Sequence, residues 1–290
     1  MSLLRQIRRS TSLQAKPEIR HGRAWASQNR YQSTTSSANS VNPDELSHFN
    51  KLAATWWDPH GPSRLLHQMN PLRHDFIRTC FSEFPAGPEP KSYLDVGCGG
   101  GIFAESAARL QTSRRVCAVD PSKEVISVAN RHARLDPLFA DSGRLEYINQ
   151  PLEEIPLPAK DSERYDVVSL FEVLEHVTYP SAFLHSCLPF VKPGGWLVGS
   201  TIARTWTSYL TTKLVAEEVV GLVPRGTHEW EKYINAAELQ DWFARQDGWG
   251  SGRGTKIMGA VYMPGLGWKA VSGAEGWGNY FFGVRRNLSF

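Results

Sequence analysis

The stretch that decides the fold is Tyr93-Leu94-Asp95-Val96-Gly97-Cys98-Gly99-Gly100-Gly101-Ile102-Phe103. An apolar run ends at a cluster of glycines and an amphipathic pattern follows, so we predict a strand, a tight turn and a helix. Gly97 and Gly99 supply the backbone angles that such a turn requires, and their missing Cβ atoms let a ligand lie against the main chain. Two interpretations are open at this point: a plain connection, or a loop that binds a nucleoside.

The sixth position of the glycine pattern indicates which ligand fits. The dinucleotide fingerprint G-x-G-x-x-G needs Gly or Ala there, but this chain has Ile102. That residue disfavours a pyrophosphate, and with it a nicotinamide dehydrogenase. The stretch fits D-x-G-x-G-x-G better. A loop of that form suits a sulfonium amino acid joined to a ribose, because no phosphate has to be neutralised at the start of the helix.

The length and the charge distribution of the chain indicate its domain organisation. A chain of 290 residues can bury one large core, so one α/β domain and a tail are expected. Residues 1–40 carry seven Lys or Arg against one acid, a balance of +6, and since the whole chain is +3 the remainder is −3. This basic, Ser- and Thr-rich segment predicts a mitochondrial transit peptide. A disordered basic tail is the alternative, and the acidic remainder disfavours nucleic-acid methylation.

Further strands are predicted at 115–119, 145–149, 165–170 and 196–202, with helical segments between them. This alternation predicts a parallel sheet with right-handed crossovers. Asp120 follows the second strand, about 20 residues beyond the glycines, where folds of this kind hold the two ribose hydroxyls. The alternative is a cap for the helix that follows it.

Polar residues also follow the strand at 165–170, and ligands of such sheets bind where strands end. Glu172, Glu175 and His176 stand at i, i+3 and i+4, so they share one face if the segment is helical. Two carboxylates and an imidazole at that spacing suit a divalent cation, Mg²⁺ before Zn²⁺ or Mn²⁺. The alternative is that Glu175 and His176 cap the turn and form hydrogen bonds with neighbouring loops.

Residues 41–90 are expected to form a helical cap ahead of the sheet. One helix is predicted over 42–52, and a second is predicted to begin at Pro71. Arg73 lies near that start, where it either pairs with a ligand carboxylate or is a solvated surface charge. The tandem Trp56-Trp57 either seals the core or covers an aromatic substrate.

The last third of the chain departs from the alternating pattern. An insertion is expected at 206–232, where apolar residues recur at mostly helical spacing, as in a lid or a face that contacts a membrane or partner. His228 lies at its end, and an antiparallel pair of strands is predicted within 257–286. No apolar run approaches the roughly 20 residues of a membrane span, so any membrane contact is expected to be peripheral. The four cysteines stand singly, which indicates neither a zinc ribbon nor a disulfide framework.

Several motifs together carry a family resemblance. The glycine loop, Asp120, Glu172-Val173-Leu174-Glu175-His176 and Lys192-Pro193-Gly194-Gly195 resemble the class I S-adenosylmethionine-dependent methyltransferases. A more specific set is similar to the family of mitochondrial ubiquinone-biosynthesis O-methyltransferases. It consists of Trp56-Trp57-Asp58, Asn70-Pro71-Leu72-Arg73 and Pro224-Arg225-Gly226-Thr227-His228, together with the basic amino-terminal segment. The similarity covers about residues 46–286.

The resemblance implies a Rossmann-like α/β fold in a methyltransferase domain at 91–290. Its sheet would be seven-stranded and mostly parallel, with the last strand inserted antiparallel and helices on both faces. The resemblance also implies two sets of site residues. S-adenosylmethionine would be bound by Arg73, Gly97, Gly99, Asp120 and Phe171, and a divalent cation by Glu172, Glu175 and His176. Asn149-Gln150 departs from the family pattern, because it offers amides and no carboxylate, so the adenine contact is unassigned.

The implied reaction is methylation of a ring hydroxyl, on a dihydroxy-polyprenylbenzoate and on a demethylubiquinol. The family is also associated with the matrix face of the mitochondrial inner membrane and with a multiprotein biosynthetic complex. Either His176 or His228 is a candidate general base, and a cation that favours the oxyanion is the alternative. Two other functions are open: a methyltransferase of the same fold for another small molecule, and a non-catalytic scaffold that binds the cofactor.

Overall fold

A computed structural model describes residues 40–84, 87, 89–140, 143–204 and 233–288. All of them belong to one compact unit within residues 36–290. Residues 1–39 of the predicted transit peptide, the insertion at 206–232 and His228 lie outside the described residues. The division into transit peptide, helical cap and catalytic domain stays a prediction.

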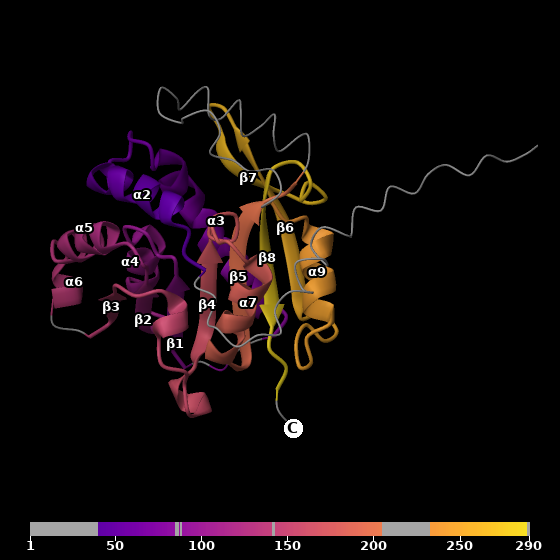
Figure 1. The fold of residues 1–290 in the computed structure, drawn as a ribbon. Helices are drawn as coiled ribbons and strands as arrows, with labels where there is room; N and C mark the ends of the chain where they lie inside the picture. Colours follow the sequence, from indigo (N-terminus) through magenta and orange to yellow (C-terminus); the bar gives the residue numbers. More distant parts are fainter. Residues whose placement is uncertain (1–39, 85–86, 88, 141–142, 205–232, 289–290) are drawn as a thin grey trace, which may run out of the picture. The chain divides into compact units, whose positions relative to one another are not determined.

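A twisted sheet of eight strands lies at the centre of the described residues (Figure 1). The strands are β1 (Lys91–Val96), β2 (Ser113–Val119), β3 (Leu145–Ile148), β4 (Tyr165–Phe171), β5 (Val191–Ile202), β6 (Thr255–Met263), β7 (Gly267–Val271) and β8 (Asn279–Arg285). Their order is β3-β2-β1-β4-β5-β8-β6-β7. The first five pair in parallel, and β8 lies antiparallel between β5 and β6. The predicted fold, with its last strand inserted antiparallel, is confirmed.

The number of strands differs from the seven expected. The segment predicted as one pair of strands forms three, because β6 turns back on itself through Met263 and Gly267 to form β7. Gly265 and Gly267 have φ angles of +75° and +71°, which residues with a Cβ rarely adopt. These two glycines therefore add an edge strand to the sheet.

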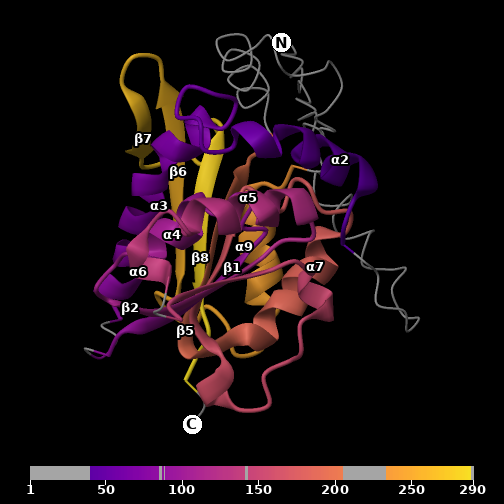
Figure 2. The same cartoon turned by 90° about the vertical axis from the view of Figure 1, so that its left-hand side faces the viewer.

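Helices cover both faces of the sheet. They are α2 (Pro43–Leu52), α3 (Arg64–Ser82), α4 (Ile102–Ala108), α5 (Lys123–Ala133), α6 (Pro137–Ala140), α7 (Pro180–Cys187) and α9 (Ala236–Ala244), with 3₁₀ turns η2 (Ala53–Thr55), η3 (Leu152–Glu154), η4 (Asp161–Glu163) and η5 (Leu188–Phe190). Figure 2 shows α3, α4 and α5 in front of the strands, with α9 behind them. On that other face, Trp242 of α9 donates its Nε1–H to Ser181 Oγ of α7 at 2.9 Å.

Helix α3 corrects the prediction that Pro71 begins a helix. The helix starts at Arg64 and runs through Pro71 to Ser82. A proline in a helix interior removes one hydrogen bond and costs about 3 kcal/mol. The buried residues of α3 continue at helical spacing past Pro71, and their burial in the core offsets that cost. They are Met69, Arg73, Phe76, Ile77 and Cys80.

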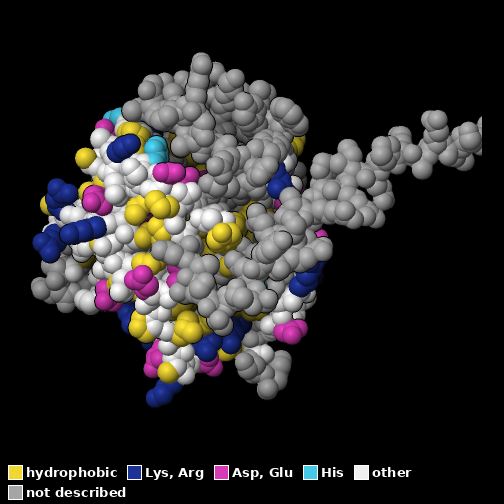
Figure 3. Space-filling model, viewed as in Figure 1, with side chains coloured by type: hydrophobic (Ala, Val, Ile, Leu, Met, Phe, Trp, Pro, Cys, Tyr) yellow, Lys and Arg dark blue, Asp and Glu magenta, His cyan; other side chains and the backbone are white. Residues whose placement is uncertain are grey.

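The surface of the described part carries charges of both signs. On the face seen in Figure 3, the side chains of Lys and Arg are interspersed with those of Asp and Glu. Within the described ranges, the helices are too short or too polar for any one of them to cross a membrane.

Candidate active site

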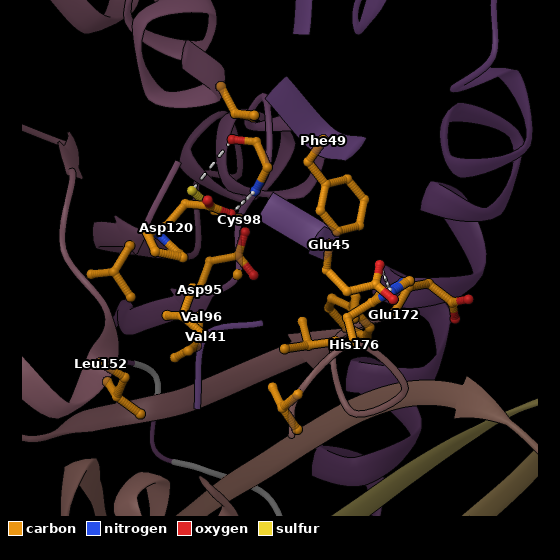
Figure 4. A pocket seen from close by; sticks show the side chains of 18 of the residues that line it. Val41, Glu45, Phe49, Asp95, Val96, Cys98, Asp120, Leu152, Glu172 and His176 are labelled. Carbon is orange, nitrogen blue, oxygen red and sulfur yellow. Dashed lines mark hydrogen bonds and ion pairs between the residues drawn. The ribbon is translucent and has the colours of Figure 1, made fainter. Parts of the chain in front are cut away.

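A cavity of about 330 Å³ lies where β1, β2 and β4 end. Figure 4 shows two groups of side chains on opposite sides of it. We call one the glycine-loop wall, made by Gly97, Gly99 and Asp120, and the other the histidine wall, made by Glu45, Phe49, Glu172, Glu175 and His176. Helix α2 supplies Glu45 and Phe49, so the amino-terminal helix forms part of the cavity.

The glycine-loop wall has the predicted strand, turn and helix. Gly97, Gly99 and Gly101 have φ angles of +68°, +54° and +90°, in the left-handed region that favours glycine. A Cβ atom on Gly99 would lie 2.3 Å from Cζ2 of Trp56, and one on Gly97 would lie 2.7 Å from Val173 Cγ2. These positions admit glycine because both the backbone angle and the space require it.

The tandem tryptophans brace this loop from behind. The ring of Trp56 packs over Gly99 and Gly100 and borders the cavity. Trp57 donates its Nε1–H to the carbonyl of Gly100 at 2.8 Å, and its ring stacks on His132 with centroids 3.5 Å apart. Of the two interpretations left open by the sequence, these contacts support the one in which the tryptophans seal the core, because Trp56 is buried with Ala53, Ile102 and Val125.

Asp120 lies beside the loop with its carboxylate already oriented. Oδ2 accepts the backbone N–H of Gly99 at 3.0 Å, and Oδ1 accepts that of Ser122 at 2.8 Å. The residue that caps α5 is Ser122, which accepts the N–H of Val125, so the helix-cap interpretation of Asp120 is wrong. Burial raises the pKa of Asp120, while the two backbone hydrogen bonds act in the opposite direction. Each carboxylate oxygen keeps a second lone pair for a ribose hydroxyl.

Arg73 is buried at the base of the cavity and is not a surface charge. Its side chain is 4% exposed, and its Nε has no hydrogen-bond partner among the described residues. Burial lowers the pKa of Arg73, against the charges of Glu172 and Asp95. The guanidinium carbon lies 5.0 Å from the centroid of the Phe171 ring, within range of a cation–π interaction. A buried guanidinium with an unused donor suits an anionic ligand group.

Asp95 is the buried acid nearest the glycine turn in sequence. It accepts a hydrogen bond from Ser169 Oγ at 2.7 Å. Burial raises the pKa of Asp95 to about 7, although this hydrogen bond and the charge of Arg73 act in the opposite direction. The two buried groups, Arg73 and Asp95, therefore stabilise each other's charged forms.

The histidine wall differs from its prediction. Residues 172–177 form turns and not a helix, because Glu172 has a φ angle of +58° and ends the strand abruptly. Glu172 Oε2 accepts from Asn279 Nδ2 at 2.9 Å, while its Oε1 is buried without a partner among the described residues. Glu175 accepts from Thr201 Oγ1 at 2.8 Å. Burial, followed by the charge of Glu172, raises the pKa of Glu175.

The predicted metal ligands therefore share a wall of the cavity but have separate partners. In the part of the chain that the structure describes, no three His, Cys, Asp or Glu side chains form a group that could hold a metal ion. The donor set of Glu172, Glu175 and His176 does not fit a cation in this arrangement, since each side chain is turned toward a different neighbour.

Glu45 is a site residue that the sequence did not indicate. Its Oε2 lies 3.0 Å from Nδ1 of His176, and the ring of Phe49 meets the imidazole edge to face at 5.0 Å. Burial lowers the pKa of His176, but the hydrogen bond with Glu45 and the charges of the surrounding acids outweigh it and raise the pKa. No local signal could have revealed this pair, because the two residues are 131 positions apart.

The two amide side chains after β3, Asn149 and Gln150, differ in their surroundings. Asn149 donates its amide N–H groups to the carbonyls of Asp120 and Pro121 at 3.1 and 3.0 Å. Gln150 lines the cavity together with Leu152. Of the two amides, Gln150 is therefore the one available to a ligand.

Comparison with known proteins agrees with this fold. A family model described as a methyltransferase domain matches residues 65–247. Among solved structures, a magnesium protoporphyrin IX methyltransferase from Synechocystis with bound SAH has a TM-score of 0.57 at 15% identity, covering 84% of this chain and 99% of its own. The plantazolicin methyltransferase BpumL, in complex with SAH, has a TM-score of 0.55 at 16% identity and covers 84% and 97%. The fold is thus that of the methyltransferases.

Curated relatives narrow the class. A protein of Schizosaccharomyces pombe named ubiquinone biosynthesis O-methyltransferase, mitochondrial, is 48% identical over 78% of this chain and 77% of its own. The Candida albicans protein of the same name is 39% identical, covering 85% and 86%. The chain therefore belongs to the family of ubiquinone biosynthesis O-methyltransferases, as the sequence motifs predicted.

Proposed function

We propose that this protein uses S-adenosylmethionine to methylate ring hydroxyls of 3,4-dihydroxy-5-polyprenylbenzoate and of demethylubiquinol. The substrate class is supported by relatives that carry the ubiquinone biosynthesis O-methyltransferase name at 34–48% identity. The use of this cofactor is supported above all by the buried Arg73. Its Nε has no hydrogen-bond partner among the described residues, and the residue lines the cavity.

The glycine-loop wall, with Arg73 and Phe171 that also line the cavity, fits S-adenosylmethionine. Arg73 would bind its carboxylate, Asp120 its ribose hydroxyls, and Phe171 would border it. Gly97 and Gly99 line the same cavity, and a Cβ at either position would collide with Val173 or Trp56, so only glycine keeps this loop shape. When bound, the cofactor supplies an electrophilic methyl group.

The histidine wall would handle the proton of the acceptor. A phenolic hydroxyl titrates near pH 10, so methylation at neutral pH needs a base that takes its proton. A carboxylate only accepts hydrogen bonds, so Nδ1–H of His176 donates to Glu45 and Nε2 is left to accept a proton. The raised pKa of His176 makes its neutral form a stronger base and lowers the fraction that is neutral at a given pH. His228 remains the other predicted base and lies outside the described residues.

The predicted divalent cation stays a prediction. Its ligands would have to leave Asn279, Thr201 and Glu45 to converge. Magnesium is the cation that the carboxylates favour.

We further propose a mitochondrial location at the matrix side of the inner membrane, as a peripheral member of a multi-subunit complex. The names of the fungal relatives support the mitochondrial part, and the basic segment at 1–40 is the predicted transit peptide. A reporter fused to residues 1–40 should enter mitochondria, and a diffuse cytosolic signal would contradict this assignment.

The function is tested with the purified full chain, methyl-labelled S-adenosylmethionine and a short-tailed dihydroxy-prenylbenzoate. We expect label on a ring oxygen, and none on the matched analogue whose two hydroxyls are already methylated. Label on nitrogen or carbon of another acceptor would indicate a different methyltransferase. Cofactor binding without any turnover would indicate a scaffold. A parallel reaction in chelator tests the cation, because full activity there would eliminate it.

A further inference from the structure

The hairpin of β6 and β7 extends beyond the rest of the sheet (Figure 1). Ala260 of β6 pairs with Asn279, which also pairs with Ile202 at the end of β5. Beyond this level, β6 continues for three residues to Met263 and pairs there with β7 alone. At about 3.3 Å per residue, the hairpin therefore projects about 10 Å past the end of β5.

The projection lies at the edge of the sheet where the cavity is. Strand β6 runs in the same direction as β5, because both are antiparallel to β8. The carboxyl end of β6 therefore lies on the same edge as the ends of β1 and β4, which lead into Gly97 and Glu172. A surface that received the hairpin would face the cavity edge of the protein.

The hairpin combines exposed apolar side chains with a pair of aromatic rings. Met263 and Leu266 at its tip (residues 263–266) are 37% and 67% exposed. Directly below the tip, Tyr262 and Trp268 form an edge-to-face pair with centroids 5.5 Å apart. Such amphipathic rings are enriched where apolar and polar phases meet. Lys269 is the one charged residue in the sequence from 261 to 270, so the segment carries no acid to repel anionic lipid.

The base of the hairpin is held firmly. Trp268 donates its Nε1–H to the carbonyl of Leu65 in α3 at 3.1 Å, and its ring is partly buried against the core. The tip is thus presented on a rigid support and needs no rearrangement to reach a surface.

We propose that the tip of this hairpin inserts into the lipid surface and places the cavity edge against the bilayer. The proposal rests on the proposed function, since a polyprenylated acceptor partitions into lipid. A second copy of the chain is disfavoured, because a stable protein interface buries about 800 Å² per partner and the tip has four residues. In addition, β7 is a short edge strand with an exposed lysine, a feature that discourages edge-to-edge pairing.

The test is flotation of the purified full chain with vesicles of phosphatidylcholine, with and without phosphatidylglycerol. The variant M263E/L266E should lower the partition coefficient at least about tenfold, since two apolar side chains lose their burial. The matched control is L135E. Leu135 is 76% exposed and follows α5, at the opposite edge of the sheet, so its change should leave flotation as in the wild type. Lys269→Gln should weaken binding to the anionic vesicles alone.

Three flotation results would overturn the proposal: a wild-type chain that does not float, equal flotation of M263E/L266E, or an equal loss in L135E. A drop in oligomer mass of M263E/L266E in the absence of vesicles would assign the tip to a second copy. Methylation of a soluble short-tailed acceptor keeps this test separate from the proposed function. M263E/L266E should retain that activity, whereas a wild type that lacks it would refute the function and leave the flotation result standing.

Discussion

The two walls of the cavity differ in how they are built. On the glycine-loop wall, backbone groups hold the site in place: the N–H groups of Gly99 and Ser122 donate to the Asp120 carboxylate. On the histidine wall, side chains from α2, β5 and β8 hold His176, Glu175 and Glu172 in place. The first wall is made by two short segments 21 residues apart in sequence, and the second is made by contacts between residues much farther apart. We infer that the first wall, together with Arg73, binds the cofactor and that the second serves the acceptor.

The largest effect is expected from Gly99→Val. The change places a β-branched residue at a φ angle of +54° and its Cβ 2.3 Å from the Trp56 ring, so the free energy of unfolding should fall by roughly 5 kcal/mol. Binding of SAH, measured by calorimetry, should disappear. Gly143→Val is the matched control, because Gly143 has a similar φ angle of +58° with nothing within 4 Å of a Cβ. Equal losses in both variants would mean that backbone strain alone accounts for the effect.

The next effect concerns pH and the buried carboxyl group of Asp95. The folded-state pKa of Asp95 is raised from 3.8 to about 7, so the folded protein binds this proton more tightly than the unfolded chain. The stabilisation is fully present below pH 3.8 and is lost as pH rises to about 7. Relative to Asp95→Asn, the wild type should lose about 4 kcal/mol of unfolding free energy between pH 4 and pH 8.

Denaturant unfolding at several pH values measures this difference. Asp120→Asn is the comparison on the glycine-loop wall, where backbone hydrogen bonds support the carboxylate, and its difference from the wild type should vary less with pH. A wild-type curve parallel to that of Asp95→Asn would contradict the assignment of Asp95.

The smallest effect is expected from Arg73→Lys. A lysine keeps the charge but loses the planar donor array, so SAH affinity should fall about thirtyfold, or about 2 kcal/mol. Affinity for 5′-methylthioadenosine, which has no amino-acid part, should change little. Calorimetry with both ligands decides the point, since a parallel loss for both would show that Arg73 does not bind the carboxylate.

The two walls also differ in how much of each could be predicted from the sequence. The turn at Gly97 and Gly99 and the acid at Asp120 are local signals, because their spacing along the chain sets their geometry. The wall around His176 is not local. Its partner Glu45 is 131 residues away. The left-handed angle of Glu172 begins a turn, so the condition that the segment be helical is not met.

Tertiary packing also changed two predicted elements outside the site, helix α3 and the last pair of strands. Helix α3 continues across Pro71 because the burial of Phe76 and Cys80 stabilises it, although proline normally starts or ends a helix. The glycines at 265 and 267 turned one predicted strand pair into three strands. Neither outcome can be read from spacing alone, since both depend on what the segment packs against.

The most direct test of the division between the walls is the variant His176→Gln, assayed for SAH binding and for methyl transfer to a short-tailed dihydroxy-prenylbenzoate at saturating S-adenosylmethionine. We predict a Kd for SAH within about twofold of the wild type and a kcat at least about a hundredfold lower, as loss of a general base implies. A Kd that weakens in step with kcat, or a kcat that is unchanged, would contradict the account.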